Sequence, residues 1–205
     1  MESENVLKDL TFEFQDMQGQ DRLRQLILYI ANKCENNSRF GMTKLVKILY
    51  FADFESYRQR GKPITGLAYI KQPYGPVPEP FFTVRDSMVG KDIVIRTQAT
   101  LGDREQQRVI AMREPDLSLF SAEDIAIVDQ VIELVWKLNA EQVSNMSHGL
   151  AWLAAKDKER IPYQAAYIND NITSDDLAMA KFMANEYKGG EYKQTTVGEL
   201  AHAVR

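Results

Sequence analysis

The stretch that decides the fold reads MTKLVKILYFADFESYRQRGKP and covers residues 42–63. Its apolar side chains recur at intervals of three and four, the period of an amphipathic helix with one face against a core. The pattern therefore predicts a helix from Met42 to Arg60, ended by Gly61 and the following Lys62-Pro63. The predicted core face carries Leu45, Ile48, Leu49, Ala52 and Ser56.

Positive charge gathers around this helix. Residues 39–71 hold seven basic side chains against two acidic ones, an excess of five, whereas the whole chain has a net charge of −4. We place Lys44, Lys47 and Arg58 on the exposed polar face of the helix. Two interpretations stay open: an ordinary solvated helix face, or a patch that attracts an acidic partner.

A proline-rich connector follows the helix. Four of the chain's seven prolines lie in residues 73–80. Proline fixes its own φ and favours an extended residue before it, so this connector is expected to be stiff and non-helical. It follows a short strand predicted at 67–71. We expect Gly75, Pro76 and Pro78 to have structural roles, with Pro78 or Pro80 in the first turn of a helix over 79–89.

The remaining elements follow from the same periodicities. Further helices are expected at 21–34, from Ser121, from Asn139, and from Thr173 to Lys188. Two β-type runs, at 93–95 and 109–112, are typical of a hairpin.

The predicted fold class is therefore α+β and mainly helical, with a small antiparallel sheet or hairpin. This order of elements is also typical of a winged helix-turn-helix with residues 91–112 as the wing. We expect an N-terminal extension at 1–19, a single domain at 20–188 and a loosely ordered tail at 189–205.

Composition limits the function classes. The chain has 205 residues, 44% hydrophobic and 26% charged, which is typical of one globular domain. Its one cysteine, Cys34, cannot form an internal disulfide, and with only His148 and His202 beside it no four-ligand Cys/His zinc site can form. The apolar runs are shorter than a membrane span requires and no secretory signal is visible, so a cytoplasmic protein without membrane contact is expected.

No catalytic constellation is apparent. The glycines of the central region are isolated, so a phosphate-binding loop is not predicted. Cys34 falls on the apolar side of its helix and is expected to be a buried small hydrophobe. His148 and Trp152 are spaced to share a helix face, although Gly149 interrupts it, and a capping and stacking role is expected. We predict no enzyme activity, no cofactor and no metal.

Several short motifs together resemble the Panacea domain, the SocA-like antitoxin domain of bacterial and phage toxin–antitoxin operons. The similar segments are Thr43–Asp53, Pro63–Gly66, Tyr69–Lys71, Tyr74–Pro78, the pair Ser147-His148, Trp152 and Ile161–Tyr163. The resemblance covers about residues 20–170. One difference is visible: the family often has a proline where this chain reads Gly149-Leu150-Ala151.

The resemblance implies a non-enzymatic antitoxin that neutralises a cognate toxin by direct binding. One member of the family is an adaptor that delivers its toxin to the ClpXP protease, so delivery is the alternative to simple blocking. We expect the partner surface to include the basic helix and the neighbouring segment 69–77, with tyrosines as anchors and basic side chains at the rim. The candidates are Lys44, Lys47, Tyr50, Tyr57, Arg58, Tyr69 and Tyr74.

Three alternatives stay open. The partner surface could instead lie on the acidic C-terminal helices, with the tyrosines in the core. A winged-helix DNA-binding autorepressor is the second alternative, but its reading helix at 79–89 offers only Arg85 and Asp86 as charged side chains after Glu79, so DNA binding is not favoured. An unrecognised hydrolase is the third.

Overall fold

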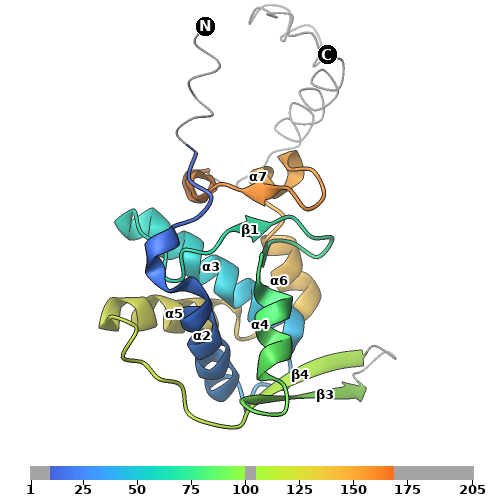
Figure 1. Ribbon diagram of the computed structural model, residues 1–205. Helices are drawn as coiled ribbons and strands as arrows, with labels where there is room; N and C mark the ends of the chain where they lie inside the picture. The colour runs from blue at the N-terminus through green and yellow to red at the C-terminus, as the bar shows by residue number, and fades with distance from the viewer. Residues whose placement is uncertain (1–9, 100–104, 169–205) are drawn as a thin grey trace, which may run out of the picture.

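The computed structural model of the protein describes residues 10–99 and 105–168 (Figure 1). In chain order its elements are η2 (Gln15–Met17), α2 (Gly19–Lys33), α3 (Met42–Arg60), β1 (Tyr69–Ile70), β2 (Val77–Pro78), α4 (Phe81–Met88), β3 (Ile93–Ala99), β4 (Glu105–Ala111), α5 (Ala122–Val135), α6 (Ala140–Met146), α7 (Leu150–Ala154), β5 (Arg160–Ile161) and η3 (Tyr163–Tyr167). Helices and small antiparallel sheets make up this part of the chain, which confirms the predicted α+β, mainly helical class.

Helix α3 lies at the centre of the molecule, and α2, α5, α6 and η3 all pack against it (Figure 1). Its bounds, Met42–Arg60, are those predicted from the sequence. Gly61 ends it in the left-handed conformation, with φ of 69°, and its N–H donates to the Tyr57 carbonyl. Glycine suits this position because it has no β-carbon to oppose a positive φ.

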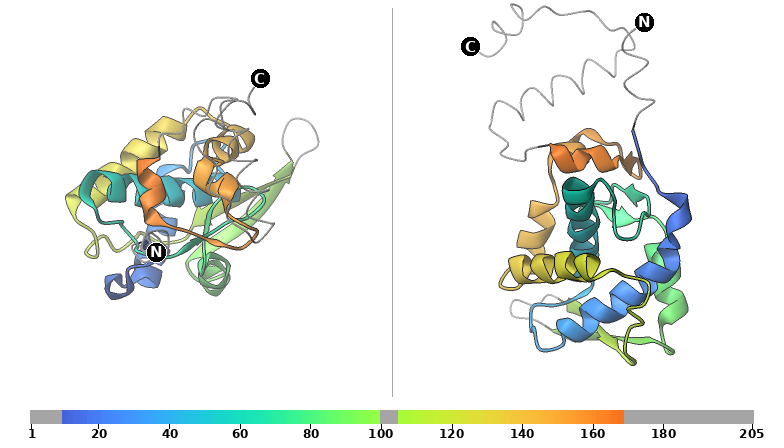
Figure 2. Two further views of the ribbon diagram at one scale, coloured as in Figure 1. Left: turned by 90° about the horizontal axis from the view of Figure 1, so that it is seen from above. Right: turned by 90° about the vertical axis from the view of Figure 1, so that its left-hand side faces the viewer.

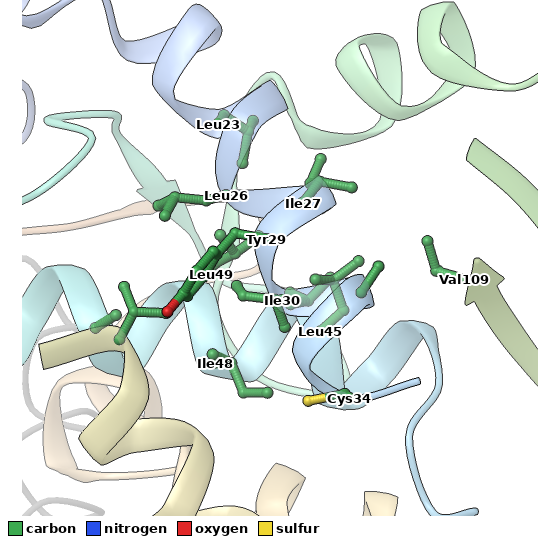
Figure 3. Close-up of a cluster of buried hydrophobic side chains, with 14 of the residues drawn as sticks. Leu23, Leu26, Ile27, Tyr29, Ile30, Cys34, Leu45, Ile48, Leu49 and Val109 are labelled. Carbon is green, nitrogen blue, oxygen red and sulfur yellow. The ribbon is translucent and has the colours of Figure 1, made fainter. Parts of the chain in front are cut away.

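The main core lies between α2 and α3. Figure 3 shows Leu23, Leu26 and Ile27 of α2 pointing toward the same interior as Leu45, Ile48 and Leu49 of α3, with Val109 of β4 beside them. The predicted core face of α3 is confirmed, since Leu45, Ile48, Leu49, Ala52 and Ser56 are each at most 1% exposed. Cys34 is buried as expected, and burial raises the pKa of its thiol to about 11.

Two separate sheets are formed. In the first, β1 lies between β2 and β5 and pairs with both in antiparallel fashion. Strand β2 lies within the proline-rich connector, and Pro78 is tolerated there because β2 is an edge strand. In the second, β3 and β4 form the predicted hairpin, with Ile93 opposite Ala111. Strand β2, which precedes α4, therefore pairs with β1 and not with the β3–β4 hairpin.

The two predicted helix starts at Ser121 and Asn139 agree with the structure. Ser121 and Asp124 form a capping box at α5, and Asn139 and Gln142 form another at α6. Helix α4 begins at Phe81, so Pro80 occupies the N-cap rather than the first turn. The helix expected at 173–188 and the tail at 189–205 lie outside the described residues.

A second, aromatic cluster joins the two ends of the described chain above α3. Its buried members are Phe54, Tyr69, Ile161 and Tyr163, and Phe14 packs against them. The Tyr163 N–H donates to the Thr11 carbonyl at 2.8 Å. Figures 1 and 2 place this cluster's segments at the end of the molecule opposite the β3–β4 hairpin. No helix among residues 10–99 and 105–168 is long and apolar enough to cross a membrane.

Candidate interaction surface

The two lysines expected on the surface of α3 are buried. Lys44 and Lys47 are each 1% exposed, so their predicted place on the exposed face of this helix is wrong, whereas Arg58 is exposed as predicted. Lys44 Nζ donates to the carbonyls of Trp136 and Leu138, both at 2.9 Å, just after the end of α5. A long side chain can bury its aliphatic stem while its ammonium reaches the unpaired carbonyls of a helix C-terminus. Lys44 is therefore a helix cap rather than a rim charge.

Arg60, Arg58 and Lys71 of the 39–71 segment are also engaged within the chain. Arg60 pairs with Asp124 at 2.5 Å, and Arg58 pairs with Glu55 at 2.6 Å. Lys71 Nζ donates to the Ala155 carbonyl at 2.7 Å. The local excess of positive charge thus serves mainly to join α3 and its neighbours to carbonyls and carboxylates elsewhere in the chain.

Lys47 supports the tight turn at Gly75. Its Nζ donates to the Pro76 carbonyl at 2.8 Å, and burial lowers the pKa of its ammonium group to about 7. Gly75 has φ of 98°, and a β-carbon there would lie 2.1 Å from Ser147 Oγ and 2.7 Å from Lys47 Nζ. Both the backbone conformation and the space at this position therefore require glycine.

His148 and Trp152 hold the same turn from the other side. Their rings stack at 3.8 Å between centroids with 13° between planes, across the break that separates α6 from α7. Trp152 Nε1 donates to the Gln72 carbonyl at 3.0 Å, and Ser144 Oγ donates to the Tyr74 carbonyl at 2.8 Å. The side chains of α6 and α7 thus fix the path of residues 72–76.

Asp53 is a buried polar centre. Its carboxylate accepts hydrogen bonds from the backbone N–H groups of Ile64 (2.8 Å) and Thr65 (2.6 Å), from the Thr65 hydroxyl, and from the Tyr69 hydroxyl (2.8 Å). Burial raises the pKa of this carboxyl, although those hydrogen bonds oppose the shift. Tyr69 is 1% exposed, so its expected place on a partner surface is wrong.

An open groove of about 420 Å³ lies beside α3. It is lined by Tyr50, Phe51, Phe54, Glu55 and Arg58 of α3, Gln130, Val131 and Leu134 of α5, Met146 of α6, Ala165 and Ala166 of η3, and Ile168. Large apolar side chains stand open to solvent here: Leu134 is 63% exposed, Ile168 42% and Met146 41%. A contiguous apolar area of this kind is typical of an interaction site.

The predicted partner residues divide between this groove and the rest of the molecule. Tyr50 and Arg58 line the groove. Tyr57 is half-buried beside it, with ring contacts to Tyr163 and Tyr167. Tyr74 is 75% exposed but does not line the groove.

Sequence reasoning missed the α5 wall of the groove. The sequence predicted the helix that starts at Ser121, but Leu134 was not among the candidate partner residues. Ile127, Val131 and Leu134 form a second stripe at i, i+4 and i+7, which was the available signal for a second apolar contact.

The described residues contain no group of three or more His, Cys, Asp or Glu side chains that could hold a metal ion. Among the curated proteins searched, no match to this chain was found. The family model described as "Antitoxin SocA-like, Panacea domain" matches residues 45–153, which is more than half of the chain and extends from α3 into α7. The motifs that hold the Gly75 turn lie within this match, and the chain belongs to the family of SocA-like antitoxins with a Panacea domain.

Proposed function

We propose that the protein is an antitoxin that neutralises one cognate toxin by binding it directly in the groove beside α3. The family supports a toxin–antitoxin role. The observation that carries the choice of surface is the set of exposed apolar side chains at Leu134, Met146 and Ile168 around one groove.

The lining of the groove has the composition of a binding interface. Aromatic rings and an arginine are enriched at interface centres because they bury a large area and keep polar groups for hydrogen bonds. Tyr50, Phe51 and Phe54 supply the rings, and Arg58 and Glu55 supply a charge pair at the edge. The toxin face that fits is an apolar ridge flanked by polar groups that can replace the Arg58–Glu55 contact.

Co-expression with the neighbouring gene product tests this proposal. Leu134→Glu places a charge in the groove, and we expect it to abolish rescue of growth while the circular dichroism spectrum stays that of the wild type. Phe82→Glu is the matched control, because Phe82 is 46% exposed on α4, away from the groove lining. Loss of rescue with both variants, or with neither, would contradict this surface.

Blocking and delivery to a protease differ in what happens to the toxin. If binding alone neutralises it, the cellular level of toxin stays constant when the antitoxin is co-expressed. If the antitoxin is an adaptor, the toxin level falls, and deletion of ClpXP restores it. We favour blocking, which needs only the groove, and the toxin half-life in both strains checks this choice.

The DNA-binding alternative gains no support from α4. Arg85 pairs with its neighbour Asp86 at 2.6 Å and lies over the Phe82 ring. A reading helix needs several free polar side chains for base edges and phosphates. A salt-dependent gel shift with upstream DNA would contradict this assignment.

A further inference from the structure

We infer that Tyr74 is a second anchor for the toxin, so that the bound toxin spans α6, with the groove on one face of this helix and Tyr74 beside the other. The part of the toxin that receives Tyr74 is an apolar pocket with a carboxylate within reach of the tyrosine hydroxyl. This contact rests on the proposed function, because it adds a second site for the same partner.

The turn at residues 72–76 is fixed by the rest of the domain. Side chains of three helices donate to its carbonyl groups, and Gly75 leaves no space for a β-carbon. The donors are Trp152 Nε1 to the Gln72 carbonyl, Ser144 Oγ to the Tyr74 carbonyl and Lys47 Nζ to the Pro76 carbonyl. A loop held in this way loses little conformational freedom when a partner binds it, which favours affinity.

The side chain at the tip of this turn faces solvent. Tyr74 is 75% exposed, more than any other large apolar side chain among residues 10–99 and 105–168. Its backbone carbonyl holds the turn, and across the same ranges its ring and hydroxyl form no hydrogen bond or aromatic contact. One exposed apolar side chain is ordinary on a protein surface. A tyrosine on a fixed backbone is typical of an interface anchor, because it buries a large ring and has few rotatable bonds to order.

The surroundings of the turn are basic, which defines the chemistry of the pocket. Burial, and then the charges of Lys47 and Lys71, lower the pKa of the His148 imidazole beside the turn. Lys71 is half-buried, and its Nζ lies 4.4 Å from the centroid of the Trp152 ring. Positive charge at this place attracts an acidic partner surface. A carboxylate there also accepts a short hydrogen bond from the phenol hydroxyl.

The groove and the turn lie on opposite faces of α6. Met146 lines the groove, and Ser144, two positions earlier, donates to the turn. At 3.6 residues per turn these positions are about 200° apart around the helix, and a helix with its side chains is about 10–12 Å across. The groove has twelve lining residues within the described chain, fewer than the roughly 20–30 that each partner of a stable interface contributes. One toxin that spans α6 reaches both places and gains the missing area.

Binding of the full chain to the purified product of the neighbouring gene tests the second anchor. We expect Tyr74→Ala to weaken this binding about thirtyfold, the effect of losing a hot-spot tyrosine. Tyr74→Phe keeps the ring but loses the hydroxyl, and a loss of about fivefold is expected. Met112→Ala is the matched control, because Met112 is 56% exposed directly after β4 and should bind as the wild type does. Isothermal titration calorimetry measures the affinities, and thermal denaturation should give the same melting temperature for all four proteins.

Photo-crosslinking locates the two contacts in the complex. A photoreactive phenylalanine placed at position 74, or at position 134, should join the antitoxin to the toxin. The same group at position 112 should not. A product of two antitoxin chains from position 74 would overturn the inference, in favour of a contact between copies.

The two proposals fail in different ways. If Tyr74→Ala binds as tightly as the wild type while Leu134→Glu abolishes binding, the second anchor is wrong and the groove stands. If Tyr74→Ala weakens binding while Leu134→Glu does not, the toxin does not span α6 and the groove is wrong. Wild-type affinity for Tyr74→Phe would overturn the carboxylate in the pocket. A wild-type chain that does not bind the neighbouring gene product would overturn the proposed function, and the second anchor with it.

Discussion

Two sets of side chains on α3 differ in what they do. The buried set, Lys44, Lys47 and Asp53, is bonded to other parts of the chain. The groove set, Tyr50 and Arg58, lines an open groove. The buried set and Tyr50 all belong to the segment Thr43–Asp53. The comparison teaches that one short motif can build the domain and also contribute a side chain to an open surface.

The largest effect is expected in the buried set, at Asp53. Asp53→Ala leaves two backbone N–H groups and the Thr65 hydroxyl buried without their acceptor, whereas the Tyr69 hydroxyl keeps the Leu49 carbonyl at 3.0 Å. We expect a loss of about 3–5 kcal/mol in the free energy of unfolding, since each buried group without a partner costs about 1–3 kcal/mol. Asp53→Asn is the control, since it keeps one acceptor oxygen and should lose less. Urea denaturation of both variants checks this prediction. An equal loss of unfolding free energy in the two variants would mean that the acceptor oxygen kept by Asp53→Asn does not stabilise the fold.

A comparison of Gly75 with Gly61 separates the energetic cost of backbone strain from that of crowding. Gly61 and Gly75 both have positive φ, but a β-carbon at Gly61 meets nothing within 4 Å, whereas at Gly75 it meets Ser147 and Lys47. We expect Gly75→Ala to cost about 2–4 kcal/mol and Gly61→Ala about 1 kcal/mol. Thermal denaturation checks the difference, and equal melting temperatures would mean that the turn relaxes without cost.

Lys47 should make stability depend on pH. Burial holds its pKa at about 7 in the folded protein, against 10.5 for an ordinary lysine. Between these values the unfolded chain binds a proton that the folded chain does not. The contribution of Lys47 to stability therefore rises with pH across this window, by at most about 1.4 kcal/mol per pH unit.

Lys47→Met removes this titration. We expect the wild type to gain stability relative to the variant between pH 7 and pH 10, and the difference to be constant below pH 6. Lys62→Met, at an exposed position, is the control and should run parallel to the wild type. Urea midpoints across the pH series measure the difference, and parallel curves for all three proteins would disprove the assignment.

The smallest effect on stability is expected in the groove. Leu134 is 63% exposed, so Leu134→Glu should change the free energy of unfolding by less than about 0.5 kcal/mol, as is usual for surface positions. A loss as large as that of Gly75→Ala would mean that the groove is structural. The comparison between the buried set and the groove would then be wrong.

The sequence predicted the core of the fold because the core obeys helical periodicity. Leu45, Ile48 and Leu49 are placed correctly, and so are the capping box at Ser121 and the hairpin. Lys44 and Lys47 were misplaced because α3 is surrounded on nearly every side, so position on the helix does not separate buried from exposed residues. The carbonyls that bind them belong to Trp136, Leu138 and Pro76, which no local pattern connects to α3.

The candidate site was only partly predictable. Tyr50 and Arg58 were found, because an aromatic residue and an arginine on one helix are common at interfaces. The rest of the groove was not found, since α5, α6 and η3 come together only in the folded chain. Strands β1, β2 and β5 were hard to foresee for a similar reason, because each has two residues and depends on its partners.

The buried position of Tyr163 has a consequence for synthesis on the ribosome. The N-terminal segment at Phe14 and Thr11 is made early, but its partner in the aromatic cluster is made more than a hundred residues later. Ala165, Ala166 and Ile168, which close the groove, follow directly. A nascent chain therefore has no complete groove until nearly the whole domain has emerged. Under the proposed function, neutralising capacity then depends on the number of finished chains, and a truncated translation product has none.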